Sequence, residues 1–229
     1  MGKPEQAPPP GRPSKPSPPP VLQTARYGRY VALLAIVIVA LITVNTIVTK
    51  PNGVAGLAPG ERLVPFAVPL ASSTLEGDAN VATRYHQGEA GPVPACDVHE
   101  GGALNICQLY ERGPVVLALF IDGGSCTQVL STMQSLVSSF PAVRFVAVAI
   151  KGERGPVRRL IRARHLTFPV GLDKDGALAA LYKLATCPQV TFALRGGVVQ
   201  SRALLSSPSP ATLRRRVAEL VAAKGPADR

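Results

Sequence analysis

Residues 113–129 read GPVVLALFIDGGSCTQV, and this stretch decides the fold class. It opens with a glycine and a proline, and the continuous apolar run that follows is typical of a strand buried on both faces of a sheet. After a pair of glycines, Ser125 and Gln128 match a capping box, which predicts a helix over residues 125–140. A buried strand that leads straight into a helix favours an α/β domain.

The rest of the C-terminal region continues this alternation of strand-like and helix-like segments. Strands are expected at residues 143–150, 190–194 and 198–202, and the turn at 195–197 joins the last two as a hairpin. Helices are expected at 156–164 and 177–183, followed by a C-terminal helix that enters through Ser209 and Pro210. The chain of 229 residues has room for one domain of this kind.

The N-terminal region predicts a membrane anchor. Residues 31–49 carry no charge, and as a helix they would span about 29 Å, close to the thickness of a bilayer core. A cleaved signal peptide is the alternative, but the apolar run is long for one and no clear cleavage site follows. We expect a proline-rich disordered tail over 1–29, a transmembrane helix over 30–49, a spacer over 50–60 and a folded domain over 61–223.

The net charge of +11 suggests an anionic partner, and its distribution indicates which one. Five basic residues and one acid precede the apolar run, so the positive-inside rule places the N-terminus in the cytoplasm and the domain outside it. The expected anionic partner is therefore the bilayer and not nucleic acid. The absence of Trp also disfavours base stacking. A second basic cluster at 154–164 is interpreted as a solvated helix face, with lipid headgroups or an acidic partner as the alternative.

Four segments, taken in order, resemble the thioredoxin fold, and more narrowly its membrane-tethered redoxin and TlpA-like bacterial branch. They are LVPFAVP at 63–69, RGPVVL at 112–117, GSC at 124–126 and CPQVTF at 187–192. The resemblance covers about residues 60–222. It implies an α/β thioredoxin-like fold with a central mixed sheet flanked by helices, and a cis-proline loop at Pro188.

Cys126 is the candidate nucleophile. It lies in the first turn of the expected helix, where the positive end of the helix dipole favours the reactive thiolate. Ser125, Thr127 and Asp122 are supporting candidates. Thr127 could form a hydrogen bond to a substrate sulfur or a peroxide oxygen, although a Thr in the first turn of a helix is ordinary. Asp122 could assist proton transfer, with a cap of the strand end in solvent as the alternative. A small buried thiol without reactivity is the alternative for Cys126 itself.

The sequence departs from the thioredoxin pattern after Cys126, because Thr127, Gln128 and Val129 follow and the usual Cys-x-x-Cys is missing. In the resembling fold, the residue before the cis-proline packs beside the redox cysteine. The resemblance therefore implies Cys187 as the second thiol of the catalytic pair.

Cys96 and Cys107 are interpreted as a structural disulfide that closes a loop, although four cysteines allow more than one pairing. A redox relay through this second pair is the alternative. The three histidines show no ligand spacing, so no zinc site and no other cofactor is expected.

Three functions remain open from the sequence. The first is a membrane-tethered, extracytoplasmic thiol-disulfide oxidoreductase that acts on cysteine-containing exported proteins or receives electrons from a membrane donor. The second is a peroxiredoxin-like thiol peroxidase, although only Cys126 matches the peroxiredoxin motif. The third is a non-catalytic thioredoxin-fold binding module with structural disulfides.

Overall fold

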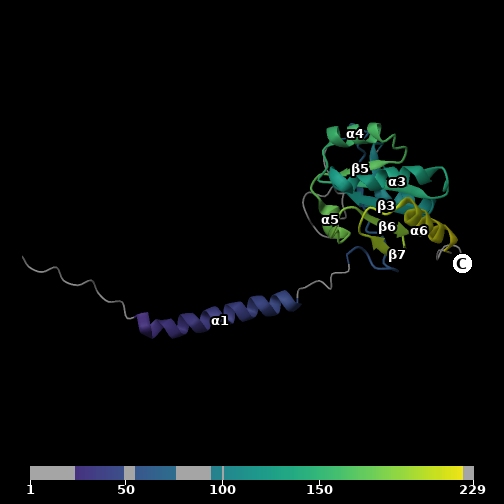
Figure 1. Ribbon diagram of the computed structural model, residues 1–229. Coiled ribbons are helices and arrows are strands. Elements are labelled where there is room, and N and C mark those ends of the chain that lie inside the picture. The colour runs from purple at the N-terminus through teal and green to yellow at the C-terminus, as the bar shows by residue number, and fades with distance from the viewer. Residues whose placement is uncertain (1–23, 49–54, 76–93, 100, 224–229) are drawn as a thin grey trace, which may run out of the picture. The chain divides into compact units, whose positions relative to one another are not determined.

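The computed structural model describes residues 24–48, 55–75, 94–99 and 101–223 (Figure 1). The chain divides into two compact units, Met1–Asn52 and Gly53–Arg229. In the first, helix α1 covers Thr24–Val48. Among the residues that the structure describes, no helix is both long and apolar enough to cross a membrane. The anchor predicted over 30–49 is therefore not confirmed, and most of the predicted tail lies outside the described residues.

The second unit is built on a five-stranded sheet in the order β5-β4-β3-β6-β7. Its strands are β3 (Val115–Phe120), β4 (Arg144–Ile150), β5 (Val170–Asp173), β6 (Gln189–Ala193) and β7 (Val199–Leu204). β3, β4 and β5 run parallel, whereas β6 is antiparallel to β3 and β7 is antiparallel to β6. All six residues of β3 are buried, as the continuous apolar run predicted. The sheet is mixed, and β3 lies at its centre.

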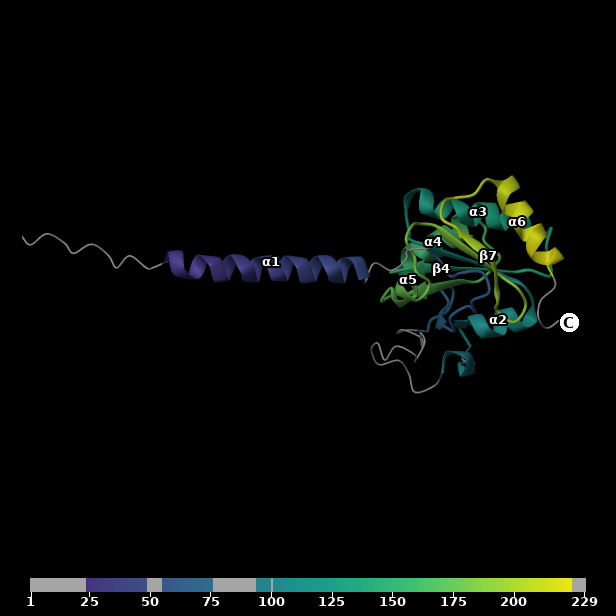
Figure 2. The same ribbon diagram turned by 90° about the horizontal axis from the view of Figure 1, so that it is seen from below.

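Helices cover both faces of this sheet. One face carries α3 (Gln128–Val137), α4 (Arg154–Ala163) and α6 (Pro210–Ala222), whose buried side chains pack on alternate residues of β3. The other face carries α2 (Ile106–Arg112) and α5 (Ala177–Leu181). Figure 2 shows α3 and α6 on one side of the sheet and α2 on the other. The Ser209 side chain caps α6 by accepting a hydrogen bond from the Thr212 amide, in agreement with the predicted helix entry.

A small two-stranded sheet adds to the face that carries α2. It pairs β1 (Ala67–Pro69) with β2 (Ala103–Asn105), and β1 also lies against β5. Leu57 is buried in this part of the core, and the Gly56 amide donates to the Lys183 carbonyl oxygen. Residues 55–60, which the sequence suggested as a spacer, therefore pack as part of the folded unit.

Candidate functional site

The turn after β3 differs from the helix start predicted at Ser125. Gly123 and Gly124 adopt φ of 120° and 55°, a region that favours glycine. The next residues form a short 3-10 helix, η3 (Gly124–Thr127), before α3 begins at Gln128. Neither helix has a side-chain cap, so the predicted capping box of Ser125 with Gln128 is wrong. The turn is instead shaped by backbone that only glycine adopts easily.

Cys126 and Cys187 meet at this turn. The structure joins them in a disulfide with a Cα–Cα distance of 5.2 Å, although 61 positions separate them in the sequence. Both residues are half-buried, whereas the residues just before Cys126 are exposed. The peptide bond between Cys187 and Pro188 is cis, and Pro188 is buried. The pair is the one that the sequence resemblance implied.

A backbone amide at the end of β3 contacts the sulfur of the second cysteine. Ile121, the first residue after the strand, donates from its N–H to Cys187 Sγ across 3.2 Å. The partly buried Cys187 side chain packs against the core on the α3 side of the sheet. A hydrogen-bond donor at this position favours sulfur when it carries negative charge, because the amide stabilises a thiolate more than a neutral thiol.

An arginine directly after α4 holds the other side of the turn. Arg164, which follows the last residue of α4, donates to the carbonyl oxygen of Thr127 at 2.7 Å and to its hydroxyl at 2.9 Å. The same guanidinium donates to Ser131 Oγ at 2.9 Å. The buried Thr127 hydroxyl in turn donates to the Gly124 carbonyl oxygen. Thr127 therefore ties the turn together from within, while its hydroxyl already has protein partners.

Two more arginines of the basic cluster also bind backbone. Arg154 donates to the carbonyl oxygens of Leu70, Ser73 and Leu75. Arg158 donates to those of residues 71–73. The interpretation of 154–164 as a solvated basic face is therefore wrong for three of its arginines, including Arg164. These contacts join segments far apart in sequence, so spacing within the helix gave no sign of them.

The loop after β7 forms a further wall of the site. Ser207 Oγ donates to the Ser125 carbonyl oxygen, and Thr186 donates to the carbonyl oxygen of Leu205. Leu205 and Ile121 are 37% and 49% exposed, so apolar surface adjoins the cysteine loops. Asp122 is exposed beside them. Its proposed part in proton transfer stays a prediction.

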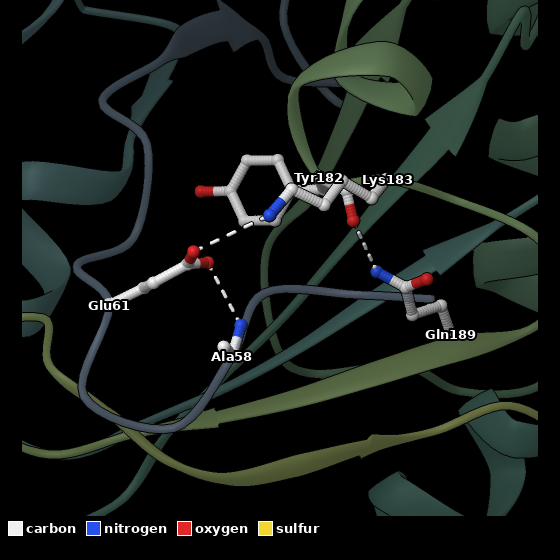
Figure 3. Close-up of polar contacts among 5 residues, drawn as sticks. All are labelled: Ala58, Glu61, Tyr182, Lys183 and Gln189. Atoms are coloured by element: carbon white, nitrogen blue, oxygen red, sulfur yellow. Dashed lines mark hydrogen bonds and ion pairs between the residues drawn. The ribbon is translucent and has the colours of Figure 1, made fainter. Parts of the chain in front are cut away.

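Polar contacts link Tyr182 and Lys183 to Gln189 and to Glu61 (Figure 3). Gln189 is fully buried, and its side-chain amide donates to the carbonyl oxygen of Tyr182 at 2.9 Å. Burial raises the pKa of Tyr182 well above its ordinary value, and its hydroxyl donates to the Val64 carbonyl oxygen. Nearby, Lys183 pairs with Glu61 at 3.4 Å. No local pattern in the sequence marks this set, because Glu61 and Val64 lie more than 100 positions before Tyr182 and Lys183.

A buried carboxyl lies at the same end of the sheet as the disulfide, where the parallel strands terminate. Asp173 ends β5, which is parallel to β3, and is 1% exposed. Desolvation, together with a hydrogen bond and charge repulsion from Asp175, raises the pKa of Asp173 to about 7. Its Oδ2 accepts from the Leu178 amide at 3.0 Å, near the start of α5. No pattern in the sequence marks Asp173 as a buried carboxyl.

Cys96 and Cys107 form the other disulfide, with a Cα–Cα distance of 5.4 Å. The segment between them is not a plain loop. Cys96 lies within the 3-10 helix η2 (Ala95–Asp97), β2 lies between the two cysteines, and Cys107 lies in the first turn of α2. Asn105 caps α2 by accepting from the Cys107 amide, and its side-chain nitrogen donates to carbonyl oxygens of residues 95, 96 and 98. The bond lies across the sheet from the Cys126–Cys187 pair, on the α2 side.

In the described part of the chain, no group of three or more His, Cys, Asp or Glu side chains is placed to hold a metal ion.

Comparison with solved structures establishes the fold. A putative thiol:disulfide interchange protein DsbE from Chlorobium tepidum superposes with a TM-score of 0.55 at 16% identity, covering 72% of this chain and 99% of that one. The peroxidoxin BcpB from Mycobacterium tuberculosis gives 0.54 at 15% identity, covering 74% and 99%. A putative protein disulfide isomerase from Bacteroides thetaiotaomicron gives 0.53 at 14%, covering 72% and 92%. No protein-family model and no curated protein gives a match. The chain has a thioredoxin-like α/β fold.

Proposed function

We propose that the chain is a membrane-tethered, extracytoplasmic thiol-disulfide oxidoreductase that cycles between a Cys126–Cys187 disulfide and two thiols. The observation that carries the proposal is the meeting of these two cysteines at the turn after β3, beside exposed apolar surface. The chemistry in the names of the similar structures agrees with it. The missing Cys-x-x-Cys is offset because Cys187 supplies the second thiol from the loop before β6.

The two half-reactions balance without a cofactor. A thiolate of a reduced partner attacks Cys126 Sγ, and the Cys126–Cys187 bond breaks. Cys187 leaves as a thiolate that accepts a hydrogen bond from the Ile121 N–H. A second thiolate of the partner then attacks the mixed disulfide, which oxidises the partner and releases Cys126. In the opposite direction, the Cys126 thiolate attacks a partner disulfide and Cys187 resolves the mixed bond.

Trapping of the mixed disulfide tests this proposal. In Cys187→Ala the resolving thiol is gone, so Cys126 should retain partners as mixed disulfides that reductant releases, and Cys126→Ala should retain none. A control Cys96→Ala/Cys107→Ala variant should react like the unmodified chain. Failure of Cys187→Ala to trap any cysteine-containing protein, together with a reduction potential of the 126/187 pair below about −300 mV, would support the non-catalytic binding module.

The rate of hydrogen peroxide consumption distinguishes the peroxidase alternative from the thiol-disulfide oxidoreductase. A peroxidase would convert Cys126 to a sulfenic acid that Cys187 condenses with, so peroxide alone would reoxidise the reduced chain rapidly. The oxidoreductase predicts faster reoxidation by a protein disulfide or small-molecule disulfide than by peroxide at equal concentration. Stopped-flow measurement of the two rates on one preparation distinguishes them.

The tether is supported by the uncharged run at 31–49 and by the large apolar side chains that α1 exposes between Tyr30 and Leu41. Such a surface needs an apolar environment. The expected partner is the bilayer, with the N-terminus cytoplasmic. Membrane fractions should keep the chain after carbonate washing and release it with detergent, whereas Leu34→Arg/Ile38→Arg should free it. A reporter enzyme of the kind that works only outside the cytoplasm should be active when it is fused after residue 223.

A further inference from the structure

A pocket lies at the end of the sheet where β3 and β4 begin, opposite the end that carries the disulfide. The redox function does not use this pocket. It has a volume of about 330 Å³, and its lining includes Leu109 and Arg112 of α2, Val137 of α3, Arg144 of β4 and Phe168 before β5. Arg144 pairs with Val115 at the start of β3, whereas the disulfide turn follows the end of that strand. The two sites are therefore separated by a strand length of about 20 Å.

Two guanidinium groups that form no ion pair within the described ranges distinguish this pocket from an ordinary packing gap. Among the residues that the structure describes, neither Arg112 nor Arg144 has an acidic partner. The Nε of Arg144 is buried and has no hydrogen-bond acceptor within the described part of the chain. A buried donor without an acceptor costs free energy, so an acceptor from a ligand or from solvent is expected at this position.

The remaining lining is apolar, and none of the nine lining residues is acidic. A volume of this size is about ten times that of one water molecule and reaches the lower end of the range for small-molecule sites. Guanidinium groups bind carboxylates through paired N–H donors. We propose that this pocket binds a small organic acid, with the carboxylate held by Arg112 and Arg144 and the apolar body against Leu109, Val137 and Phe168.

Calorimetric titration of the full-length chain in neutral-detergent micelles tests the proposal, with a micelle-only blank. The probe is 4-phenylbutyrate, and its neutral counterpart is 4-phenylbutyramide, which keeps the shape and removes the charge. We expect saturable binding of the acid at least about tenfold tighter than that of the amide. Arg112→Gln and Arg144→Gln should each remove most of that difference. Arg159→Gln, an exposed arginine on α4, serves as the matched control and should leave it unchanged.

Comparison of the acid with the amide on the unmodified chain needs no variant, so the proposal is testable even if Arg144→Gln does not fold. Equal affinity for acid and amide, binding of the acid that both arginine variants retain, or no saturable binding at millimolar acid would each overturn it. Inorganic phosphate that binds as tightly as 4-phenylbutyrate would also overturn it, because the apolar lining would then contribute nothing. Titration of Cys126→Ala should match the unmodified chain, since the pocket is separate from the disulfide.

Discussion

The backbone N–H of Ile121 donates to Cys187 Sγ across 3.2 Å, so the end of the central strand supports one sulfur of the disulfide and not the other. This asymmetry bears on which sulfur an incoming thiol attacks. The sulfur that leaves most readily is the one whose thiolate is best stabilised. Attack is therefore expected at Cys126, with Cys187 as the leaving group.

Glutathione should consequently attach to Cys126 when it reacts with the oxidised chain. Digestion and mass spectrometry of the alkylated product should find most of the adduct on the Cys126 peptide. The Cys96→Ala/Cys107→Ala variant simplifies the peptide map and provides the control. An adduct found mainly on Cys187 would contradict the direction of attack that the Ile121 contact predicts.

Arg164 should matter both for stability and for exchange. Replacement by Met removes three hydrogen bonds to Thr127 and Ser131, so we expect a loss of about 1–3 kcal/mol in the free energy of unfolding. We also expect slower thiol exchange, because the turn that presents Cys126 loses its support and a nearby positive charge.

The control for this prediction is Arg159→Met, which removes a positive charge at an exposed position of α4, the helix that ends just before Arg164. Arg164→Lys separates the two contributions, since it keeps the charge but not the paired hydrogen bonds. Denaturation followed by far-UV circular dichroism measures stability, and the pH dependence of Cys126 alkylation measures thiolate formation. An Arg164→Met chain whose alkylation profile equals that of the control would limit Arg164 to a structural role.

The sequence predicted the buried elements well and the site only in outline. The continuous apolar run located β3, because a strand buried on both faces is mostly apolar. Strands were also expected where β4 and β6 are found, although β6 carries two buried polar residues, Gln189 and Thr191. β5 was missed because it is short and contains Gly171. That glycine is required by tertiary packing: a Cβ there would lie 2.5 Å from Val68 Cγ2 and 2.9 Å from Leu104 Cδ2.

The parts of the site that sequence could not supply are long-range contacts. The meeting of Cys126 with Cys187 was inferred from a resemblance and not from spacing. No local pattern pointed to Arg164, whose partner Thr127 lies 37 positions away. The helix start at Ser125 was wrong because the capping motif competes with a glycine turn, which hydrogen bonds from Arg164 to Thr127 and from Ser207 to Ser125 hold in place. Local rules describe a segment, whereas these features depend on what packs against it.

The Cys96–Cys107 bond should be structural. It closes a short loop, and the chain-entropy model gives a loss of about 3 kcal/mol when both cysteines become Ala. Buried Cys107 also anchors the start of α2, so in the double variant α2 should unfold before the rest of the domain. Denaturation in urea measures the loss, and exchange through Cys126 should stay within about twofold of the unmodified chain. Loss of exchange at temperatures where the variant is folded would instead favour a relay through this pair.

Asp173 should make the folded region less stable as pH rises from about 4 to 7. Its pKa in the folded state, about 7, exceeds the value of 3.8 expected for the unfolded chain. Between these values the unfolded chain has released the proton while the folded chain still holds it, so increasing pH favours unfolding. Above pH 7 the effect is complete. Asp173→Asn cannot ionise, and its side-chain oxygen can still accept from the Leu178 amide.

We therefore expect the change in the free energy of unfolding caused by Asp173→Asn to be more favourable at pH 8 than at pH 4 by roughly 1–4 kcal/mol. The upper end is the full pKa shift at about 1.36 kcal/mol per pKa unit. Urea denaturation at both pH values, with Asp97→Asn as an exposed control, measures this double difference. Tyrosine fluorescence is a suitable signal, since the chain has no Trp and Tyr182 is buried. A variant whose stability changes equally at pH 4 and pH 8 would show that the Asp173 carboxyl ionises normally in the folded state, despite its burial beside Asp175.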